Sequence, residues 1–431
     1  MDERDALLAA AVEAYEPEAA RRLVEDGADP DRVPPDGTTP LLRAVEGGSP
    51  AMVTALLGDA CPRLPEAEQG RLIDAARRWY EEGAERRLRR LTGAAGPADT
   101  VRALDSEFEC VAEITLGERT VRAGHGAVLT LLEWEFGVLP PVEELVARAV
   151  RHRGEGEGED HVDRAASLLV LIHRHSARTW AETTAFRHDP DPWRRGLAAD
   201  AVRDRLWQLS WPFPADASRR DEEWEACTRI LFEWEPEETD PHALARILQA
   251  LRHTGTDLSG HEDIALRRAG HPAPEVRREV PGLFVRPLSP DALRAVRDLC
   301  RDVDAAVRAE SAEVLAEQEP GEGDRELMAA LLRDTDPEVV SRTVRAFARG
   351  ADHSAGAAEA LVRFLDADDP DVRLNAAYGL YLRDDPRTLE AYDRVAPLGR
   401  LPADDPRLEG RWRFTSRNGV GIPGSGAPAT G

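Results

Sequence analysis

The chain has 431 residues, more than a single hydrophobic core usually serves, so several domains or a repeat structure are expected. Its formal net charge of −25 disfavours binding to the phosphate backbone of nucleic acids, which requires a basic face. All 56 basic residues are arginine, which excludes a phosphate-loop lysine, a Schiff-base lysine and a kinase-type lysine.

Cysteine usage and the N-terminal segment indicate the compartment. The four cysteines, at positions 61, 110, 227 and 300, form no CxxC pair, so reduced thiols are expected. Residues 1–5 are not a basic segment followed by an apolar one, so no signal peptide is expected. The longest apolar run, around 168–172, is too short to span a bilayer. We therefore expect a soluble, cytoplasmic protein.

Residues 1–92 contain a repeat of 33 to 34 residues. Leu7 and Leu41 are 34 residues apart, and Leu23 and Leu56 are 33 apart. The segment DGTTPLLRA at 36–44 is followed by two glycines, and an earlier copy ends in G-A-D at 27–29. This pattern resembles ankyrin repeats, although a leucine stands at position 42, where the family usually has histidine.

The physical reading of this segment agrees with that resemblance. Thr39 can cap the helix that Pro40 opens, because proline at the first helical position loses only an unpaired N–H. Gly47 or Gly48 can supply the positive φ that ends the helix.

Residues 93–125 form a connector between two repeat patterns. Apolar residues alternate with polar ones from Phe108 to Leu116, a period of two. This predicts a small β-hairpin near 108–122, with a helix as the alternative.

Residues 126–400 contain a second repeat. Prolines at 241, 274, 337 and 370, with Ala305 in one copy, are separated by 33, 31, 32 and 33 residues. The clearest copy, DDPDVR at 368–373, resembles HEAT repeats, and HDPDP at 188–192 is an upstream copy. The resemblance implies an all-α fold, an α-solenoid of stacked antiparallel helix pairs. Residues 401–431 lose the pattern, and a disordered tail is expected there.

Each HEAT-like copy reads as the start of a helix. An aspartate caps it, proline takes the first position, and a valine faces inward. In HEAT families the following arginine pairs with aspartates of its own and the adjacent repeat. The residues predicted to serve the repeats structurally are Pro241, Pro274, Arg277, Arg308, Pro337, Pro370 and Arg373.

Six of the nine tryptophans lie between Trp180 and Trp234. Tryptophan and arginine dominate binding hot spots, although tryptophan also fills joints between stacked helices. The candidate partner-binding residues are Trp193, Arg195, Trp207, Trp211 and Trp224.

Metal, cofactor and catalytic signals are weak. His173 and His175, with Asp160 and His161 upstream, are candidate metal ligands, but residues two apart on a helix point in different directions. The glutamates at 155, 157 and 159 fit a solvated loop, and a literal GxGxxG at 419–424 lacks the strand and helix that it needs. The prediction is no catalytic residue, no cofactor and no metal.

The sequence therefore favours a non-enzymatic scaffold, expected to be monomeric, that binds another protein on the concave face of the solenoid. The resemblance also leaves an enzymatic alternative, since some HEAT-like proteins are bilin lyases and others are alkylpurine DNA glycosylases with an arginine- and tryptophan-lined groove. A membrane-surface adaptor is disfavoured by the acidity and by the lack of a basic amphipathic helix.

Overall fold

The computed structural model describes residues 3–33, 37–58, 64–153, 160–211, 217–255, 260–395 and 405–418. These residues fold into helices apart from one three-stranded sheet, which confirms the predicted all-α fold with a small hairpin. The chain divides into two compact units, Met1–Trp234 (unit 1) and Glu235–Gly431 (unit 2), and each is described by itself. Within the described ranges, no helix has the length and apolarity to cross a membrane.

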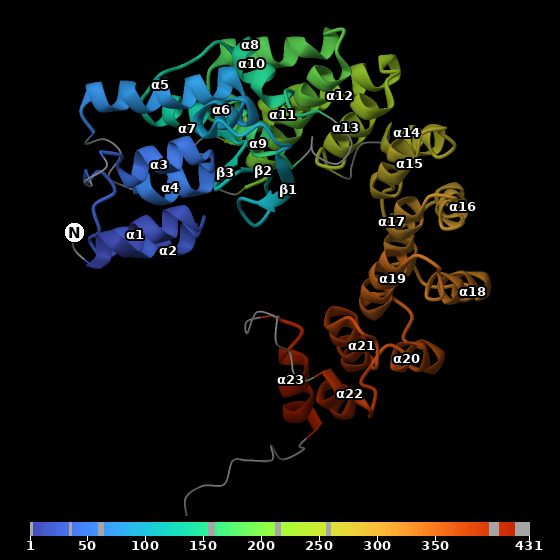
Figure 1. Ribbon diagram of the computed structural model, residues 1–431. Helices are drawn as coiled ribbons and strands as arrows, with labels where there is room; N and C mark the ends of the chain where they lie inside the picture. The colour runs from blue at the N-terminus through green and yellow to red at the C-terminus, as the bar shows by residue number, and fades with distance from the viewer. Residues whose placement is uncertain are drawn as a thin grey trace, which may run out of the picture. The chain divides into compact units, whose positions relative to one another are not determined.

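Unit 1 stacks the first helices of successive pairs, with α1, α3, α5, α7, α9 and α11 in contact one after another (Figure 1). Its elements are α1 (Glu3–Glu13), α2 (Pro17–Glu25), α3 (Pro40–Gly47), α4 (Pro50–Leu57), α5 (Glu66–Glu82), α6 (Ala84–Thr92), β1 (Asp99–Leu104), β2 (Cys110–Leu116), β3 (Arg119–Arg122), α7 (His125–Glu135), α8 (Val142–Ala149), α9 (Val162–His173), α10 (Ala177–Ala185), η2 (Phe186–His188), α11 (Pro192–Ser210) and α12 (Ala217–Trp234).

The N-terminal repeats have the predicted caps. The Thr39 hydroxyl accepts a hydrogen bond from the Leu42 amide at 3.2 Å, and Pro40 takes the first turn of α3. Gly48 ends that helix at a φ of 73°, in the left-handed region that favours glycine. Ser49 and Pro50 repeat the same start for α4. The local sequence therefore fixes both ends of α3.

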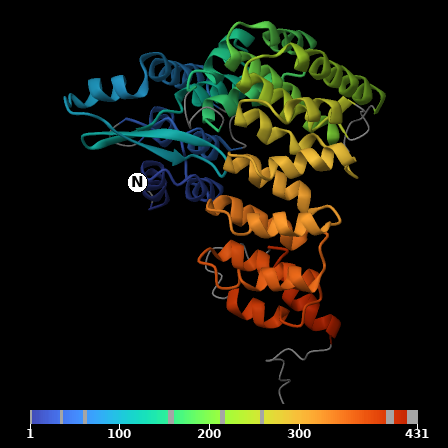
Figure 2. The same ribbon diagram turned by 90° about the vertical axis from the view of Figure 1, so that its right-hand side faces the viewer.

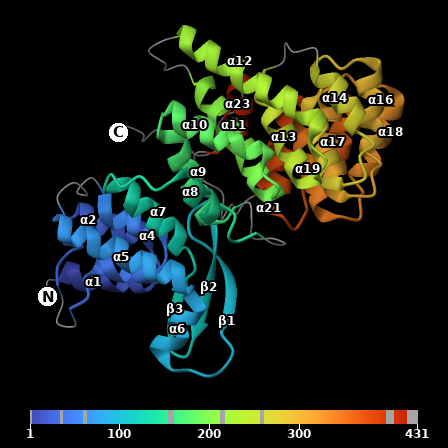
Figure 3. The same cartoon turned by 90° about the horizontal axis from the view of Figure 1, so that it is seen from above.

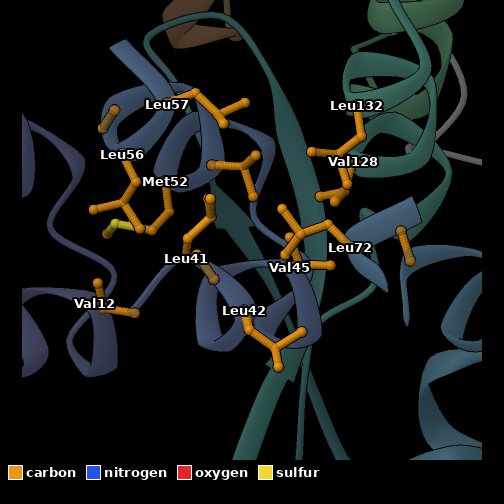
Figure 4. Packing of buried hydrophobic residues seen from close by; sticks show 14 of the residues in the cluster. Val12, Leu41, Leu42, Val45, Met52, Leu56, Leu57, Leu72, Val128 and Leu132 are labelled. Atoms are coloured by element: carbon orange, nitrogen blue, oxygen red, sulfur yellow. The ribbon is translucent and has the colours of Figure 1, made fainter. Parts of the chain in front are cut away.

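The hydrophobic core of this segment does not stop at residue 92. Leu41, Val45 and Leu72 from α3 and α5 pack in one cluster with Val128 and Leu132 from α7 (Figure 4). Helices α3 and α5 and the later helix α7 thus bury their apolar faces against each other. Residue 92 was the predicted end of a module, whereas the packing continues through it.

The connector contains a sheet in the order β1-β2-β3 with antiparallel pairing. The predicted hairpin corresponds to β2 and β3, where Ile114 pairs with Val121, and β1 is a third strand that was not predicted. The sheet is visible as the long strands of unit 1 in Figure 2, and Figure 3 shows α6 beside it. Trp79 of α5 and Leu88 of α6 pack with Ile114 and Val121, so the sheet has its own small core.

Two close contacts join the sheet to the N-terminal repeats. The Gly124 amide donates to the Gly48 carbonyl at 3.1 Å, and a Cβ on Gly48 would lie 2.0 Å from the Arg122 carbonyl oxygen. Asp105, after β1, accepts hydrogen bonds from the Ser49 hydroxyl at 2.5 Å and the Ala51 amide at 2.9 Å at the start of α4. Arg122 donates to the same carboxylate at 2.9 Å. The connector is therefore an integral part of unit 1.

Unit 2 is a stack of helix pairs in which α13, α15, α17, α19 and α21 contact in turn, with α14, α16, α18 and α20 along one side of that row (Figure 1). Its elements are η3 (Glu235–Glu237), α13 (Pro241–Leu251), α14 (Gly260–Arg268), α15 (Pro274–Glu279), η4 (Pro281–Leu283), α16 (Pro290–Leu299), α17 (Ala305–Ala316), α18 (Glu322–Leu331), α19 (Pro337–Arg349), α20 (Ala355–Val362), α21 (Pro370–Leu382), α22 (Thr388–Val395) and α23 (Glu409–Asn418).

The repeat prolines open the helices that the sequence assigned to them. Pro241, Pro274, Pro337 and Pro370 are the first residues of α13, α15, α19 and α21. Aspartate side chains cap three of these four helices and α17, and Ala273 replaces the capping aspartate before α15. The period seen in the sequence is thus a period of helix starts.

An arginine is the fourth residue of helices α11, α15, α17 and α21, and it makes the same contact in each. Its Nη1 donates to two consecutive backbone carbonyls of the turn before its own helix, as Arg308 does to Asp302 at 2.9 Å and Val303 at 3.2 Å. We call the four arginines with this contact the repeat arginines: Arg195, Arg277, Arg308 and Arg373.

Two repeat arginines also bind the next repeat. Arg277 donates to both oxygens of Asp302 at 2.7 and 2.8 Å, and Arg308 donates to both oxygens of Asp334 at 2.8 Å. Each aspartate belongs to the turn that precedes the following first helix. These ion pairs therefore link neighbouring repeats as well as closing turns.

The C-terminal segment is more structured than expected. No secondary structure was expected in 401–431, whereas Glu409–Asn418 form α23, which contacts α21 and α22. Phe414 is buried in that contact. The GxGxxG sequence at 419–424 lies outside the described residues.

Candidate partner-binding surface

An apolar cavity of about 620 Å³ lies among α9, α10, α11 and α12 of unit 1. Leu171 and Ile172 at the end of α9, Trp180 of α10 and Leu209 of α11 form much of its wall. A cavity of this size and lining suits an apolar anchor side chain of a ligand or partner. The run 168–172, which the sequence offered only as a short apolar stretch, supplies two of these residues.

Charged residues surround the cavity and Cys227 lies at its wall. Arg205 forms an ion pair with Glu223, and Arg220 and Glu222 also line the cavity. Both signs of charge are present, so the rim does not select an anionic ligand. Burial raises the pKa of the Cys227 thiol to about 12, which keeps it protonated and removes it as a nucleophile.

Two exposed tryptophans lie at the C-terminal end of α11. Trp207 and Trp211, at the end of α11, are 50% and 51% exposed. Their rings stand edge to face with centroids 5.2 Å apart. We call these two residues the tryptophan pair. Trp207 is in the last turn of α11 and Trp211 is the residue that follows the helix, with extended backbone angles, so it is the ring contact that makes them a single apolar ledge.

The other predicted partner-binding residues have different surroundings. Trp193 is half-buried and packs against the hydrophobic cluster of α8, α9 and α11. Arg195 donates to the carbonyls of Asp189 and Pro190, as the other repeat arginines do. Trp224 is half-buried in α12. Of the five predicted residues, the structure leaves the tryptophan pair exposed and the other three at least partly covered.

The histidines weighed as metal ligands do not come together. His173 and His175 are exposed, with ring centroids 6.1 Å apart and planes inclined by 61°. His161 instead lies against His152, with ring centroids 4.0 Å apart. The glutamates at 155, 157 and 159 lie outside the described residues.

A second cavity, of about 560 Å³, lies between α1, α3 and the β3 hairpin. Tyr15 and Trp79 line it together with Arg43 and Glu13, which are paired at 3.2 Å. Burial raises the pKa of Tyr15 to about 12, so this phenol stays protonated at neutral pH. The lining carries both signs of charge and is not the basic groove that a DNA glycosylase requires.

Comparison with known proteins agrees with this architecture. Residues 325–394, which span α18 to α22, match the family model of HEAT repeats, and residues 7–57 match that of ankyrin repeats. The chain carries both repeat types. The resemblances found in the sequence are thereby confirmed for these two segments.

The X-ray structure of YibA from E. coli is 15% identical, covers 64% of this chain and 93% of its own, and superposes with a TM-score of 0.43. No curated protein sequence matches the chain.

Proposed function

We propose that this ankyrin- and HEAT-repeat protein is a non-enzymatic scaffold that binds another protein, and that the tryptophan pair with the adjoining cavity is a principal contact. Stacked repeats of these kinds present extended surfaces that suit protein binding. The observation that carries the proposal is the exposure of Trp207 and Trp211, whose rings are in contact where α11 ends.

The chemistry of this surface defines the kind of partner. Two half-exposed indoles offer large apolar area at low entropic cost, and binding hot spots are rich in such residues. The cavity accepts an apolar side chain, while Arg205 and Glu223 at its rim can exchange their mutual ion pair for contacts with polar partner groups. We therefore expect a partner segment with an apolar anchor flanked by polar residues.

The location differs from the concave face favoured by the sequence alone. Within unit 2, Arg277 and Arg308 are already paired with Asp302 and Asp334, so these side chains offer no unpaired charge to a partner. The exposed aromatic area of the tryptophan pair supports a contact in unit 1 instead. We therefore propose a protein-binding scaffold whose partner contacts the tryptophan pair of unit 1.

Site-specific photo-crosslinking in the native cell tests the proposal. A photo-reactive amino acid at position 211 should capture a protein partner, and the same amino acid at position 412 should not, since Trp412 is an exposed tryptophan of unit 2. Capture should fall at least tenfold when Trp207→Ala is added, which is about 1.4 kcal/mol of binding free energy. Equal capture from positions 211 and 412, or no protein adduct at 211, would refute the proposed contact.

A further inference from the structure

A compact set of potential metal ligands lies where α9 begins in unit 1. His152 comes from the segment after α8, His161 immediately precedes α9, and Asp163 is in its first turn. One ligand atom from each residue lies within 4.8 Å of the other two. We propose that His152, His161 and Asp163 bind one divalent transition-metal ion, with Zn²⁺ as the best match.

Two atoms of this set are buried without a hydrogen-bond partner. His161 is 3% exposed and Asp163 is 1% exposed, and neither Nε2 of His161 nor Oδ2 of Asp163 makes a hydrogen bond. Buried polar atoms are nearly always satisfied, because an unpaired one forfeits its hydration without compensation. Both orphaned atoms belong to the same three-residue group, and a cation between them would satisfy both.

Asp163 is held in place from the other side. Its Oδ1 accepts a hydrogen bond from the Ala127 amide at 2.6 Å, at the start of α7. A Cβ at position 126 would lie 2.3 Å from Oδ2, so only glycine lets the carboxylate approach this helix end. The carboxylate is thus fixed through one oxygen, which leaves Oδ2 for a cation. Oδ2 already lies 3.3 Å from Nε2 of His152.

The hydrogen bonding of His161 defines its tautomer. Its Nδ1 accepts a hydrogen bond from the Asp163 amide at 3.1 Å, which puts the ring proton on Nε2. When a cation takes the Nε2 lone pair, that proton moves to Nδ1 and the hydrogen bond from the Asp163 amide is given up.

The ligand chemistry selects the ion. Two imidazole nitrogens and one carboxylate oxygen are typical zinc ligands, and calcium and magnesium prefer oxygen alone. The rings of His152 and His161 stack at 4.0 Å with 11° between their planes, so both must turn to direct a nitrogen at one ion. A tetrahedral Zn²⁺ then has a fourth position for water.

The position of the site points to a structural role. Its ligands come from the segment after α8 and from the first turn of α9, and Asp163 also holds the start of α7. A bound ion would therefore tie three segments of unit 1 together. Because the ion binds the folded state, it should raise the thermal stability of unit 1.

Metal binding to the full-length protein tests the inference. Protein stripped with a chelator is titrated with Zn²⁺ against a chromophoric competitor, and with Co²⁺ to record the visible absorption of a tetrahedral site. We expect one equivalent, tetrahedral Co²⁺ absorption and a rise in melting temperature. His152→Ala should weaken Zn²⁺ binding by about 100-fold or more, since it removes one of three ligands.

Two further variants make the result decisive. The double variant His173→Ala, His175→Ala removes an exposed histidine pair outside the site and should bind Zn²⁺ as the unchanged protein does. Asp163→Asn retains an Oδ1 acceptor for the Ala127 amide and should lose most of the affinity while the far-ultraviolet circular dichroism is unchanged. Binding below one equivalent, no loss in His152→Ala, or an equal loss in the exposed-pair variant would overturn the inference.

Discussion

Replacement of one repeat arginine, Arg308→Met, should destabilise unit 2 at the joint between α17 and α19. The Arg308 and Asp334 side chains are 16% and 11% exposed, and two hydrogen bonds of 2.8 Å connect them. Methionine keeps an apolar stem of similar length, so the change removes mainly the charge and the donors.

The magnitude follows from these contacts. Removing one partner of a fully buried ion pair costs about 3–5 kcal/mol. Asp334 keeps the hydrogen bond from the Asp336 amide at 2.9 Å and some hydration, so the lower end applies, about 3 kcal/mol. Arg373→Met is a matched control, because the hydrogen bonds from Arg373 go to the Ala367 and Asp368 carbonyls and its Nε is unpartnered. It should cost about 1 kcal/mol.

Hydrogen exchange measured by mass spectrometry resolves the two repeats separately. A loss of about 3 kcal/mol corresponds to roughly a hundredfold faster exchange in peptides from α17 and α19. The control should accelerate exchange in its own repeat less than about tenfold. If Arg308→Met and Arg373→Met accelerate exchange equally, the link between repeats contributes nothing and the reasoning is refuted.

Three other outcomes are expected. Gly48→Ala should cost well over the roughly 1 kcal/mol of a left-handed alanine, because the new Cβ meets the Arg122 carbonyl. Gly93→Ala, at a left-handed φ of 67° with open space, should cost only about that amount, and chemical denaturation compares the two variants. Leu132→Ala should lower the free energy of unfolding of unit 1 by about 3 kcal/mol, and unit 1 should still unfold in one transition, at a lower denaturant concentration, when followed by tryptophan fluorescence. Two separate transitions would contradict a core shared by α3, α5 and α7. Hydrogen bonds from Arg277 and Arg308 hold the pKa values of Asp302 and Asp334 below the ordinary 3.8. The ion pairs therefore stabilise the fold above that pH, and this stability should fall as the pH drops through the folded-state pKa values. If the melting temperature of Arg308→Met falls with acid as steeply as that of the unchanged protein, this reasoning is contradicted.

The repeat architecture could be predicted because, in each copy, residues adjacent in sequence determine where the first helix begins. An aspartate cap and a first-turn proline recur every 31 to 33 residues, and they act within a few residues of chain. The shared core was not predictable in this way, since the contact of Leu72 with α7 depends on tertiary packing. Strand β1 was missed because its side chains are almost all exposed and show no apolar alternation.

For the candidate binding residues, too, the sequence predicts local features but not what tertiary packing covers. The sequence marks Trp207 and Trp211 as candidates, but their exposure depends on what α9, α10 and α12 cover. Trp193 was selected on the same grounds, as a tryptophan of this segment, yet it packs against the hydrophobic cluster of α8, α9 and α11. His152 and Asp163 were not among the metal candidates of the sequence, because His152 lies nine residues before His161 and no helical spacing connects the two.

The core that passes from the first repeats into α7 decides where this chain can be cut and rejoined. A break near residue 92 would leave Leu72 and Leu132 facing water on separate pieces. Residues 1–234 form one compact unit by their internal contacts. Gene fusion or recombination that preserves folding should therefore keep residues 1–234 together, even though the ankyrin-repeat match covers only residues 7–57 of them.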